Sequence, residues 1–563
     1  MKNVCIPRLP GLTALIFWFT LLLLGPTAWG QAPLAWQWAI VSGGGLPGRP
    51  AVDAAGNVLT TGSFVGSARF GNTTLMTPTV NAFVAKLTRA GVYEWAASAT
   101  IAALGTGRAT GVTTATDSAG NVYVTGTFSG TIQFDSVSLT ESGNSGLYTD
   151  VFVAKLSPAG AWQWAVRAGG LRNEVPTALA IDARGAVYLT GNFVGPAAFG
   201  DTTLTGAGAA DVFVAKLSRE GAWQWATSAG GTGYDSGAGL TVDTAGNAYV
   251  TGTFARFGRT ALFGRTTLTS VGEADAFVAR LSSAGAWSWA VRAGGTSDES
   301  GRSLTLASDS TGDLLVLGDF TGVATFGTTL LRSVGAQDIF VARLTTTGTW
   351  RWATEAGGRG TDRSSQLVVD RQGQAYVAGD FAGSTIIFGD TPLLNASTMP
   401  NGTDVFVAHL SGAGNWEWVV VAGGSENETA SGLASDSTDS VYLTGSFSSP
   451  TLAFGPTTLP NATAPNAARP FLAHLAPPPL GLAAETTRPA ALVLFPNPAH
   501  HAIALSGLAA DAAVTLLDAV GRVVRTGRAT AAGTLTLPVA DLPPGVYVAR
   551  TGRLARRVVV AAE

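Results

Sequence analysis

Acidic residues recur at one position in this chain, four residues after the second glycine of a Gly-Gly pair. The five residues are Glu174, Asp235, Glu299, Asp362 and Glu428. Carboxylate oxygens are the ligands that Ca²⁺ prefers, so such a set could hold a cation. A simpler interpretation is that each carboxylate accepts hydrogen bonds from its own loop backbone, which would repeat in the same way. We favour the simpler interpretation, because the units that open near Gly44 and Gly105 lack the acid.

The other residues that could bind a metal or take part in catalysis do not form a recognisable set. His409 and His474 are far apart in the sequence, and His500 and His501 lie near its end. A zinc site needs three or four converging ligands, so no metal site is predicted from the histidines. The chain has no Gly-x-Ser-x-Gly elbow, no His-Glu-x-x-His and no phosphate-binding loop. Paired carboxylates for sugar hydrolysis remain open, because their separation exists only in three dimensions. We therefore predict no catalytic residue and no cofactor, with Ca²⁺ as the one candidate cation.

Composition indicates the kind of scaffold that must position these residues. Of 563 residues, 72 are glycine, 46% are hydrophobic and only 13% are charged. This balance is typical of a turn-rich globular β protein and unlike that of a disordered chain. Short apolar runs punctuated by Gly, Asn and Asp predominate, and no long helical periodicity is present. The net charge of −3 gives no reason to expect nucleic-acid binding.

Four sequence elements each occur seven times. The first is Trp-x-Trp, with Tyr93 replacing the first Trp once, and its copies are 57 to 69 residues apart. The second is an apolar run of the type Phe213–Leu217, and the third ends in Phe, as at Phe254. The fourth ends in Asp, as at Asp243, which we expect to begin a turn closed by Gly or Asn.

Each unit is predicted to contain four strands, and a period near 60 residues is typical of a propeller blade. The Asp residues before the apolar runs are expected to cap loops: Asp150, Asp211, Asp275, Asp338 and Asp404. The segment containing Phe263 and Gly264 is predicted to be a longer connection, and Gly294–Gly295 to let the chain step to the next blade.

The two ends of the repeat predict how the ring closes. Trp36–Ala39 is a fourth strand with no third strand before it, and Phe471–Leu475 is a third strand with no fourth strand after it. Paired, they would complete one blade and remove two exposed sheet edges. The predicted fold is therefore all-β: a seven-bladed β-propeller of four-stranded blades closed by the N-terminal strand, over residues 31–475.

Two segments of the repeat resemble a known family. Asp243–Gly252, of the type Asp-x-x-Gly-Asn-x-Tyr-Val-Thr-Gly, and Asp211–Leu217 resemble the bacterial β-propeller repeats called SBBP repeats. The resemblance covers roughly Trp36–Leu475, with Asp439 in place of a turn glycine and Arg469 in place of an aspartate. It implies a secreted or surface protein and leaves the activity open. In such a propeller the five acids would lie at one mouth of the central channel, where ligands usually bind.

The N-terminus is predicted to be a signal peptide, residues 1–30. Lys2 and Arg8 precede an apolar run from Leu12 to Leu24, and Ala28 and Gly30 suggest cleavage before Gln31. The run is too short to span a membrane well, so a membrane anchor is the weaker alternative. The single cysteine, Cys5, would leave with the signal, so a mature chain without disulfides is expected.

The C-terminal part is predicted to be a separate module. Residues 476–490 are a Pro-containing linker, and the short alternating runs in 491–563 are typical of a small β-sandwich. The module resembles the type A C-terminal sorting domain of the type IX secretion system, and a plain adhesive domain is the alternative. The residues that carry the resemblance include Phe495, Pro496, Asn497, Pro498, Gly521, Gly545 and Tyr547. The resemblance implies that the secretion machinery is a partner and that export runs through the periplasm.

Two functions follow from these observations. We favour a secreted or cell-surface, non-enzymatic propeller that serves as a binding or adhesion scaffold for an unidentified glycan or protein. The alternative is an extracellular polysaccharide hydrolase or lyase that uses carboxylates at the channel mouth. Regular units favour the scaffold, because an enzyme usually breaks its repeat with singular residues in one or two blades. Neither function involves nucleic acid or a membrane-spanning segment.

Overall fold

The structure is a computed structural model that describes residues 34–45, 47–101, 107–143, 146–257, 259–461, 467–477, 493–495, 499–506, 508–518, 521–551 and 554–561. The described residues form an all-β, propeller-like fold of antiparallel sheets and contain no helix. None of them therefore forms a helix that could cross a membrane. The predicted signal peptide and nearly all of the predicted linker lie outside the described residues.

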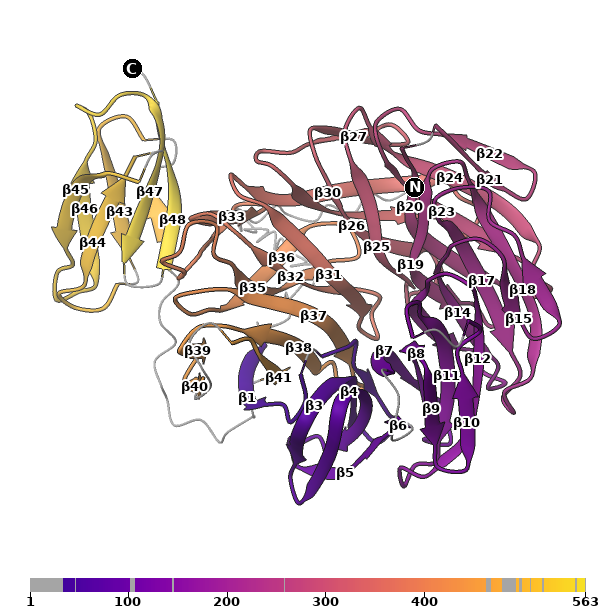
Figure 1. The fold of residues 1–563 in the computed structure, drawn as a ribbon. Helices are drawn as coiled ribbons and strands as arrows, with labels where there is room; N and C mark the ends of the chain where they lie inside the picture. The colour runs from indigo at the N-terminus through magenta and orange to yellow at the C-terminus, as the bar shows by residue number, and fades with distance from the viewer. Residues whose placement is uncertain are drawn as a thin grey trace, which may run out of the picture. The chain divides into compact units, whose positions relative to one another are not determined.

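Sets of four neighbouring antiparallel strands recur along the chain, in indigo to orange in Figure 1. In sheet order they are β2 (Ala51–Val52), β3 (Val58–Phe70), β4 (Thr73–Leu87), β5 (Tyr93–Ser98); β7 (Arg108–Thr116), β8 (Val122–Ser129), β11 (Asp150–Leu156), β12 (Trp162–Gly170); β13 (Glu174–Ile181), β14 (Val187–Phe193), β17 (Asp211–Leu217), β18 (Trp223–Gly231); β19 (Tyr234–Val242), β20 (Ala248–Arg256), β23 (Asp275–Leu281), β24 (Trp287–Gly295); β25 (Glu299–Leu306), β26 (Leu314–Phe320), β29 (Asp338–Leu344), β30 (Trp350–Gly358); β31 (Asp362–Val369), β32 (Ala375–Phe381), β35 (Asp404–Leu410), β36 (Trp416–Ala422); β37 (Glu428–Ser435), β38 (Val441–Phe447), β41 (Arg469–Ala476), β1 (Ala35–Val41).

The turn between the first two strands of a set forms as the sequence predicts. After β19, Asp243 Oδ1 accepts hydrogen bonds from the backbone N–H groups of Ala245 at 3.0 Å and Asn247 at 2.8 Å. Gly246 closes the turn with φ of +83°, a conformation that a residue with a Cβ adopts at a cost. The Tyr249 hydroxyl then donates to Asp243 Oδ2 at 3.2 Å, which ties the turn to β20.

The connection after the second strand is long, as predicted, but it is not a plain loop. It contains a two-stranded hairpin, for example β21 (Thr260–Phe263) with β22 (Thr266–Thr269), and β21 pairs with the last strand of the preceding set. The ring of Phe263 lies 5.3 Å from that of Trp287 at 88°, so the hairpin covers an aromatic core. The other short strands are β6 (Thr100–Ile101), β9 (Thr131–Phe134), β10 (Val137–Thr140), β15 (Ala197–Phe199), β16 (Thr202–Leu204), β27 (Val323–Phe326), β28 (Thr329–Arg332), β33 (Thr385–Phe388), β34 (Thr391–Leu394), β39 (Thr451–Phe454) and β40 (Thr457–Pro460).

The glycine pairs also differ from their predicted role. Gly294 and Gly295 lie inside β24 and pair with Thr325 and Ala324 of the next hairpin. A Cβ on Gly295 would lie 1.6 Å from the carbonyl oxygen of Val323, so only glycine permits this approach. The pair is therefore part of the sheet, and the step to the next set follows it.

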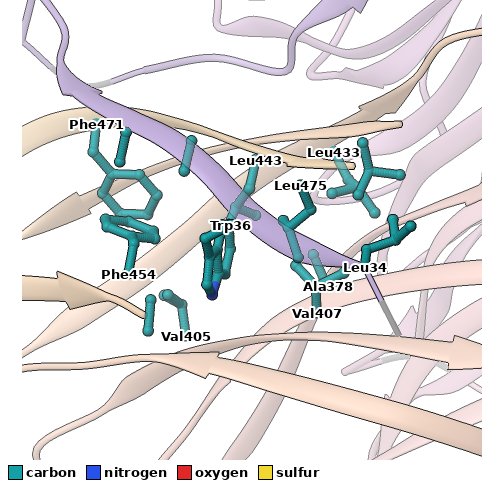
Figure 2. Packing of buried hydrophobic residues seen from close by; sticks show 14 of the residues in the cluster. Leu34, Trp36, Ala378, Val405, Val407, Leu433, Leu443, Phe454, Phe471 and Leu475 are labelled. Atoms are coloured by element: carbon teal, nitrogen blue, oxygen red, sulfur yellow. The ribbon is translucent and has the colours of Figure 1, made fainter. Parts of the chain in front are cut away.

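The N-terminal strand pairs with the last strand of the repeat. β1 and β41 are antiparallel, with Trp36 opposite Leu475. Figure 2 shows Trp36 packed among residues that come from much later in the chain, including Phe454. The two rings are 4.8 Å apart at 77°, an edge-to-face contact.

The C-terminal residues form two further antiparallel sheets, drawn in yellow in Figure 1. One sheet contains β42 (Val493–Phe495), β43 (Ala502–Ser506) and β46 (Thr534–Pro538). The other contains β45 (Val523–Arg528), β44 (Ala513–Leu517), β47 (Gly545–Thr551) and β48 (Leu554–Val560). Ile503 of the first sheet and Leu516 and Val558 of the second belong to one buried core, so the two sheets pack face to face.

Candidate functional site

All five predicted acidic residues lie at or next to the start of the first strand of a set, and each is buried. Each accepts a hydrogen bond from the second glycine of the preceding pair. The distances are 2.9 Å for Gly170 to Glu174, 2.8 Å for Gly231 to Asp235, 2.7 Å for Gly295 to Glu299, 2.6 Å for Gly358 to Asp362 and 3.0 Å for Gly424 to Glu428. These carboxylates therefore make the hydrogen bonds to their own loop backbone that the simpler interpretation expects.

Burial shifts the ionisation of these acids strongly. The pKa of Glu174 rises to about 8, mainly because burial removes water; the Gly170 hydrogen bond opposes this rise, and the nearby carboxylate of Asp150 adds to it. The pKa values of Glu299 and Asp362 also rise to about 8, mainly through desolvation. Burial thus favours the neutral form of these carboxyls, and a neutral carboxyl is a poor cation ligand.

The aspartates that begin the third strands, one in each set from the second to the sixth, cap loops, as predicted. Asp211 Oδ2 accepts from Ala207 N at 2.7 Å, and Asp338 Oδ2 accepts from Val334 N at 2.7 Å. Asp275 also receives Arg292 Nη1 at 2.7 Å. The described residues contain no group of three or more His, Cys, Asp or Glu arranged to hold a metal ion. Calcium binding at these acids stays a prediction.

Two acidic residues that the sequence analysis missed break the repeat. One position in the second strand lies just before the Phe that recurs in every unit, as Thr253 lies before Phe254. Five units have Ser, Thr or Asn at this position, but β26 has Asp319 and β32 has Asp380. Both carboxylates are buried, with exposed fractions of 1% and 5%. A comparison of equivalent positions would have found them, because burying a charge in a strand requires a partner.

Each of these carboxylates contacts the first strand of the next set. Asp319 Oδ1 accepts hydrogen bonds from the Ser364 N–H at 2.8 Å and from its hydroxyl at 2.6 Å, while Oδ2 receives Arg302 Nε at 2.8 Å. Asp380 Oδ2 accepts a long bond of 3.4 Å from Ala430 N, and its Oδ1 has no partner among the described residues. The pKa of Asp380 rises to about 7, mainly through desolvation; Arg363 opposes this rise, and the carboxylate of Asp319 adds to it.

Two cationic residues also depart from the repeat. Arg49 lies just before β2, where other units have small or polar residues such as Gly239 and Ser303, and Arg302 lies at a bulge in β25 where the next set has Ser365. Arg49 donates from Nη1 to the carbonyl of Ala238 at 3.2 Å and from Nη2 to the carbonyl of Arg302 at 3.4 Å. Arg49, Arg302, Asp319 and Asp380 form the irregular polar cluster of this fold, hereafter the inner cluster.

Two residues of the sorting motif, Gly545 and Tyr547, line a pocket in the C-terminal sheets. Gly521 closes a turn with φ of +82°, and its N–H donates to the carbonyl of Asp518 at 3.0 Å. The buried Tyr547 donates its hydroxyl to the carbonyl of Pro543 at 2.7 Å. Asp518, Pro543, Gly545 and Tyr547 line a cavity of about 370 Å³. Phe495 lies in β42, whereas Pro496, Asn497 and Pro498 lie outside the described residues.

Comparison with known families matches one segment of the repeat and the C-terminal module. Residues 224–253 match the beta-propeller repeat family SBBP, and residues 493–559 match the secretion system C-terminal sorting domain. The chain thus carries an SBBP repeat and a type IX sorting domain, and the sorting domain implies interaction with that machinery and export to the cell surface or beyond. No curated protein matches the chain significantly.

Solved structures are similar only at a low level. A fungal alcohol oxidase of the AA5 family, in complex with copper, is 13% identical and has a TM-score of 0.38, with 94% of this chain and 99% of that chain covered. PorZ, a surface component of the type IX secretion system of Porphyromonas gingivalis, is 13% identical with a TM-score of 0.26, covering 92% and 70%. An ulvan lyase of family PL25 is 10% identical with a TM-score of 0.29, covering 90% and 99%. Similarity at this level assigns neither an activity nor a ligand.

Proposed function

We propose that this chain is a secreted or cell-surface β-propeller that acts as a non-enzymatic scaffold binding an extracellular glycan or protein. The observation that carries the proposal is the state of the five repeated acids. Each is buried and hydrogen-bonded to its own glycine pair, as at Glu174 and Gly170. Carboxylates held in this way stabilise loops and are not presented to a substrate.

The same proposal includes a closed ring of seven blades. Its support is that the first strands contact one another in chain order, from β2 through β7, β13, β19, β25 and β31 to β37, and that β37 contacts β2. The pairing of β1 with β41 completes the last set from both ends of the repeat. Closure pairs the two strands that would otherwise be free at the ends of the repeat, which suits a protein that works outside the cell without disulfides.

A binding screen tests this function directly. The chain from Gln31 onward, immobilised through its C-terminus, would be exposed to arrays of neutral and acidic polysaccharides and of extracellular matrix proteins. Retained polymers would then be incubated with the protein in solution and assayed for new reducing ends and for unsaturated products. We expect retention of at least one ligand class without chain cleavage. Retention of none, together with turnover of any polymer, would contradict the scaffold.

One observation favours the alternative, an extracellular polysaccharide hydrolase or lyase. Asp319 and Asp380 depart from the repeat, and their environments differ: Arg302 pairs with Asp319, whereas Asp380 has a pKa of about 7. Carboxyl groups that differ in this way can act as base and acid. If cleavage is detected, Asp380→Asn should reduce kcat at least a hundredfold, while Asp362→Asn, a buried acid of the regular repeat, should leave it within a factor of three.

A further inference from the structure

The inner cluster contains a cation without a counter-ion. Among the described residues, no carboxylate lies within ion-pair distance of Arg49, whose guanidinium is bonded only to the carbonyls of Ala238 and Arg302. Those two bonds use two of its five N–H groups. The desolvated guanidinium also meets a like charge, because burial and Arg302 together lower the pKa of Arg49 to about 10.

Arg49 is held by hydrogen bonds to the backbone of three other four-stranded sets. Its own N–H donates to the carbonyl of Val112 at 2.9 Å, and its carbonyl accepts from Thr114 N at 3.3 Å, which fixes the residue against β7. Its side chain reaches Ala238 in β19 and Arg302 in β25, which are 189 and 253 residues away in sequence. In the closed ring proposed above, these partners lie across the central channel, so the guanidinium would lie near its axis.

We propose that Arg49, with Arg302 beside it, binds an oxyanion (a carboxylate, sulfate or phosphate group) in the central channel. This inference deepens the proposed binding function and rests on the ring proposed there. A planar guanidinium offers paired N–H donors that match the two oxygens of such a group. Arg302 is ion-paired with Asp319 through its Nε, so it offers its remaining N–H donors rather than net charge, and 44% of its side chain stays exposed. The ligand class is therefore anionic, for example an acidic polysaccharide whose charged group enters the channel.

The pattern of substitutions supports a ligand rather than a purely structural role. A guanidinium needed only for blade packing would be expected to recur once per set, as Lys155 and Lys216 do over the rings of Tyr123 and Tyr188. Arg49 occurs in one unit only, and the equivalent residue Gly239 of the fourth unit has no side chain. Arg49 is therefore the only large cation at this position of the repeat, where the other units have small or polar residues. It breaks the symmetry of the channel and would place the binding site on one side of it.

The test uses inorganic sulfate and the chain from Gln31 onward. Calorimetric titration with sodium sulfate, against sodium chloride at equal ionic strength and pH 7, should show saturable binding by the parent protein. Arg49→Met removes the charge and keeps the aliphatic stem, and we expect it to raise Kd by about tenfold to a hundredfold, the range of a charged hydrogen bond. Arg219→Met, at a side chain 65% exposed, is the matched control and should not change Kd.

Each remaining outcome also decides the proposal. No saturable sulfate binding by the parent, or equal binding by parent and Arg49→Met, would overturn it. If near-ultraviolet circular dichroism shows that Arg49→Met is unfolded, Arg49→Lys retains the charge without the planar fork. Arg49→Lys should then bind sulfate about tenfold more weakly than the parent, and an unchanged Kd would overturn the site.

A second pair of ligands separates this inference from the broader function. A sulfated polysaccharide and its desulfated form would be compared for retention by the parent and by Arg49→Met. Retention that requires both the sulfate groups and Arg49 supports both proposals. If the polymer is retained equally with and without its sulfate groups, and equally by the parent and by Arg49→Met, the scaffold proposal is supported and the oxyanion site is overturned. Sulfate binding that depends on Arg49, without retention of any polymer or protein, supports the site and counts against the scaffold.

Discussion

Replacing Glu174 by Gln should make the protein more stable at neutral and alkaline pH. The carboxyl of Glu174 is fully buried, its Oε2 accepts from Gly170 N at 2.9 Å, and its Oε1 has no hydrogen-bond partner among the described residues. The amide introduced by Glu174→Gln keeps an acceptor oxygen for Gly170 and cannot ionise. It therefore removes the cost of keeping a proton on a carboxyl that would ionise in the unfolded chain.

The sign and size follow from the folded-state pKa of about 8, against an ordinary value of 4.5. A carboxyl whose pKa is raised by folding contributes stability below pH 4.5, and that contribution is lost as the pH rises towards 8. At about 1.4 kcal/mol per pH unit, this window sets an upper limit of about 5 kcal/mol. Relaxation of the site and entry of water reduce this to about 2 kcal/mol.

The assay is urea unfolding followed by tryptophan fluorescence at pH 5 and pH 8.5. All 15 tryptophans lie at or before Trp418, so the signal reports the repeat and not the C-terminal sheets. Relative to the parent, Glu174→Gln should have nearly the same urea midpoint at pH 5 and a clearly higher one at pH 8.5. Glu220→Gln is the matched control, because its side chain is 70% exposed and should respond little at either pH.

One result would refute the reasoning about this carboxyl. If the difference between Glu174→Gln and the parent were the same at pH 5 and pH 8.5, the Glu174 carboxyl would not be held neutral by burial. A loss of stability at pH 8.5 would have the same meaning, because it would show that the ionised carboxylate is stabilised, for instance by a bound cation.

Three further predictions concern packing and charge. Gly285→Ala should cost about 2–4 kcal/mol, because φ is +82° and the added methyl would lie 2.7 Å from the Trp225 ring, whereas Gly312→Ala, with φ of +61° and open space, should cost about 1 kcal/mol; urea midpoints compare the two. Trp36→Ala should cost about 3–5 kcal/mol, measured by calorimetry, because it empties a buried contact between the two ends of the repeat. His474→Phe keeps the aromatic stacking and removes a charge that burial disfavours, since the pKa of His474 falls to about 4. Stability of the parent should therefore fall more than that of His474→Phe as the pH drops from 6.5 to 4, and equal loss in both would contradict this.

Local patterns were sufficient to predict most strands and turns. The repeated runs place Phe213–Leu217 in β17 and Trp223 at the start of β18, because the alternation of a strand and the residues of a tight turn are written in adjacent positions. The hairpin around Phe263 was missed, since its two strands have only four residues each and gain their partner from a preceding set.

The sequence by itself determined the repeat, its turns and the sorting domain, because each depends on residues close together in the chain. Tertiary structure decided which charges matter. It buried Glu174 against Gly170 and brought Arg49 to the carbonyls of Ala238 and Arg302. No local pattern specifies such contacts, since burial and the approach of residues 189 and 253 positions apart arise only when the sheets have packed. The five regular acids attract attention in the sequence, yet the inner cluster holds the residues that depart from the repeat, including Arg49, which has no carboxylate partner among the described residues.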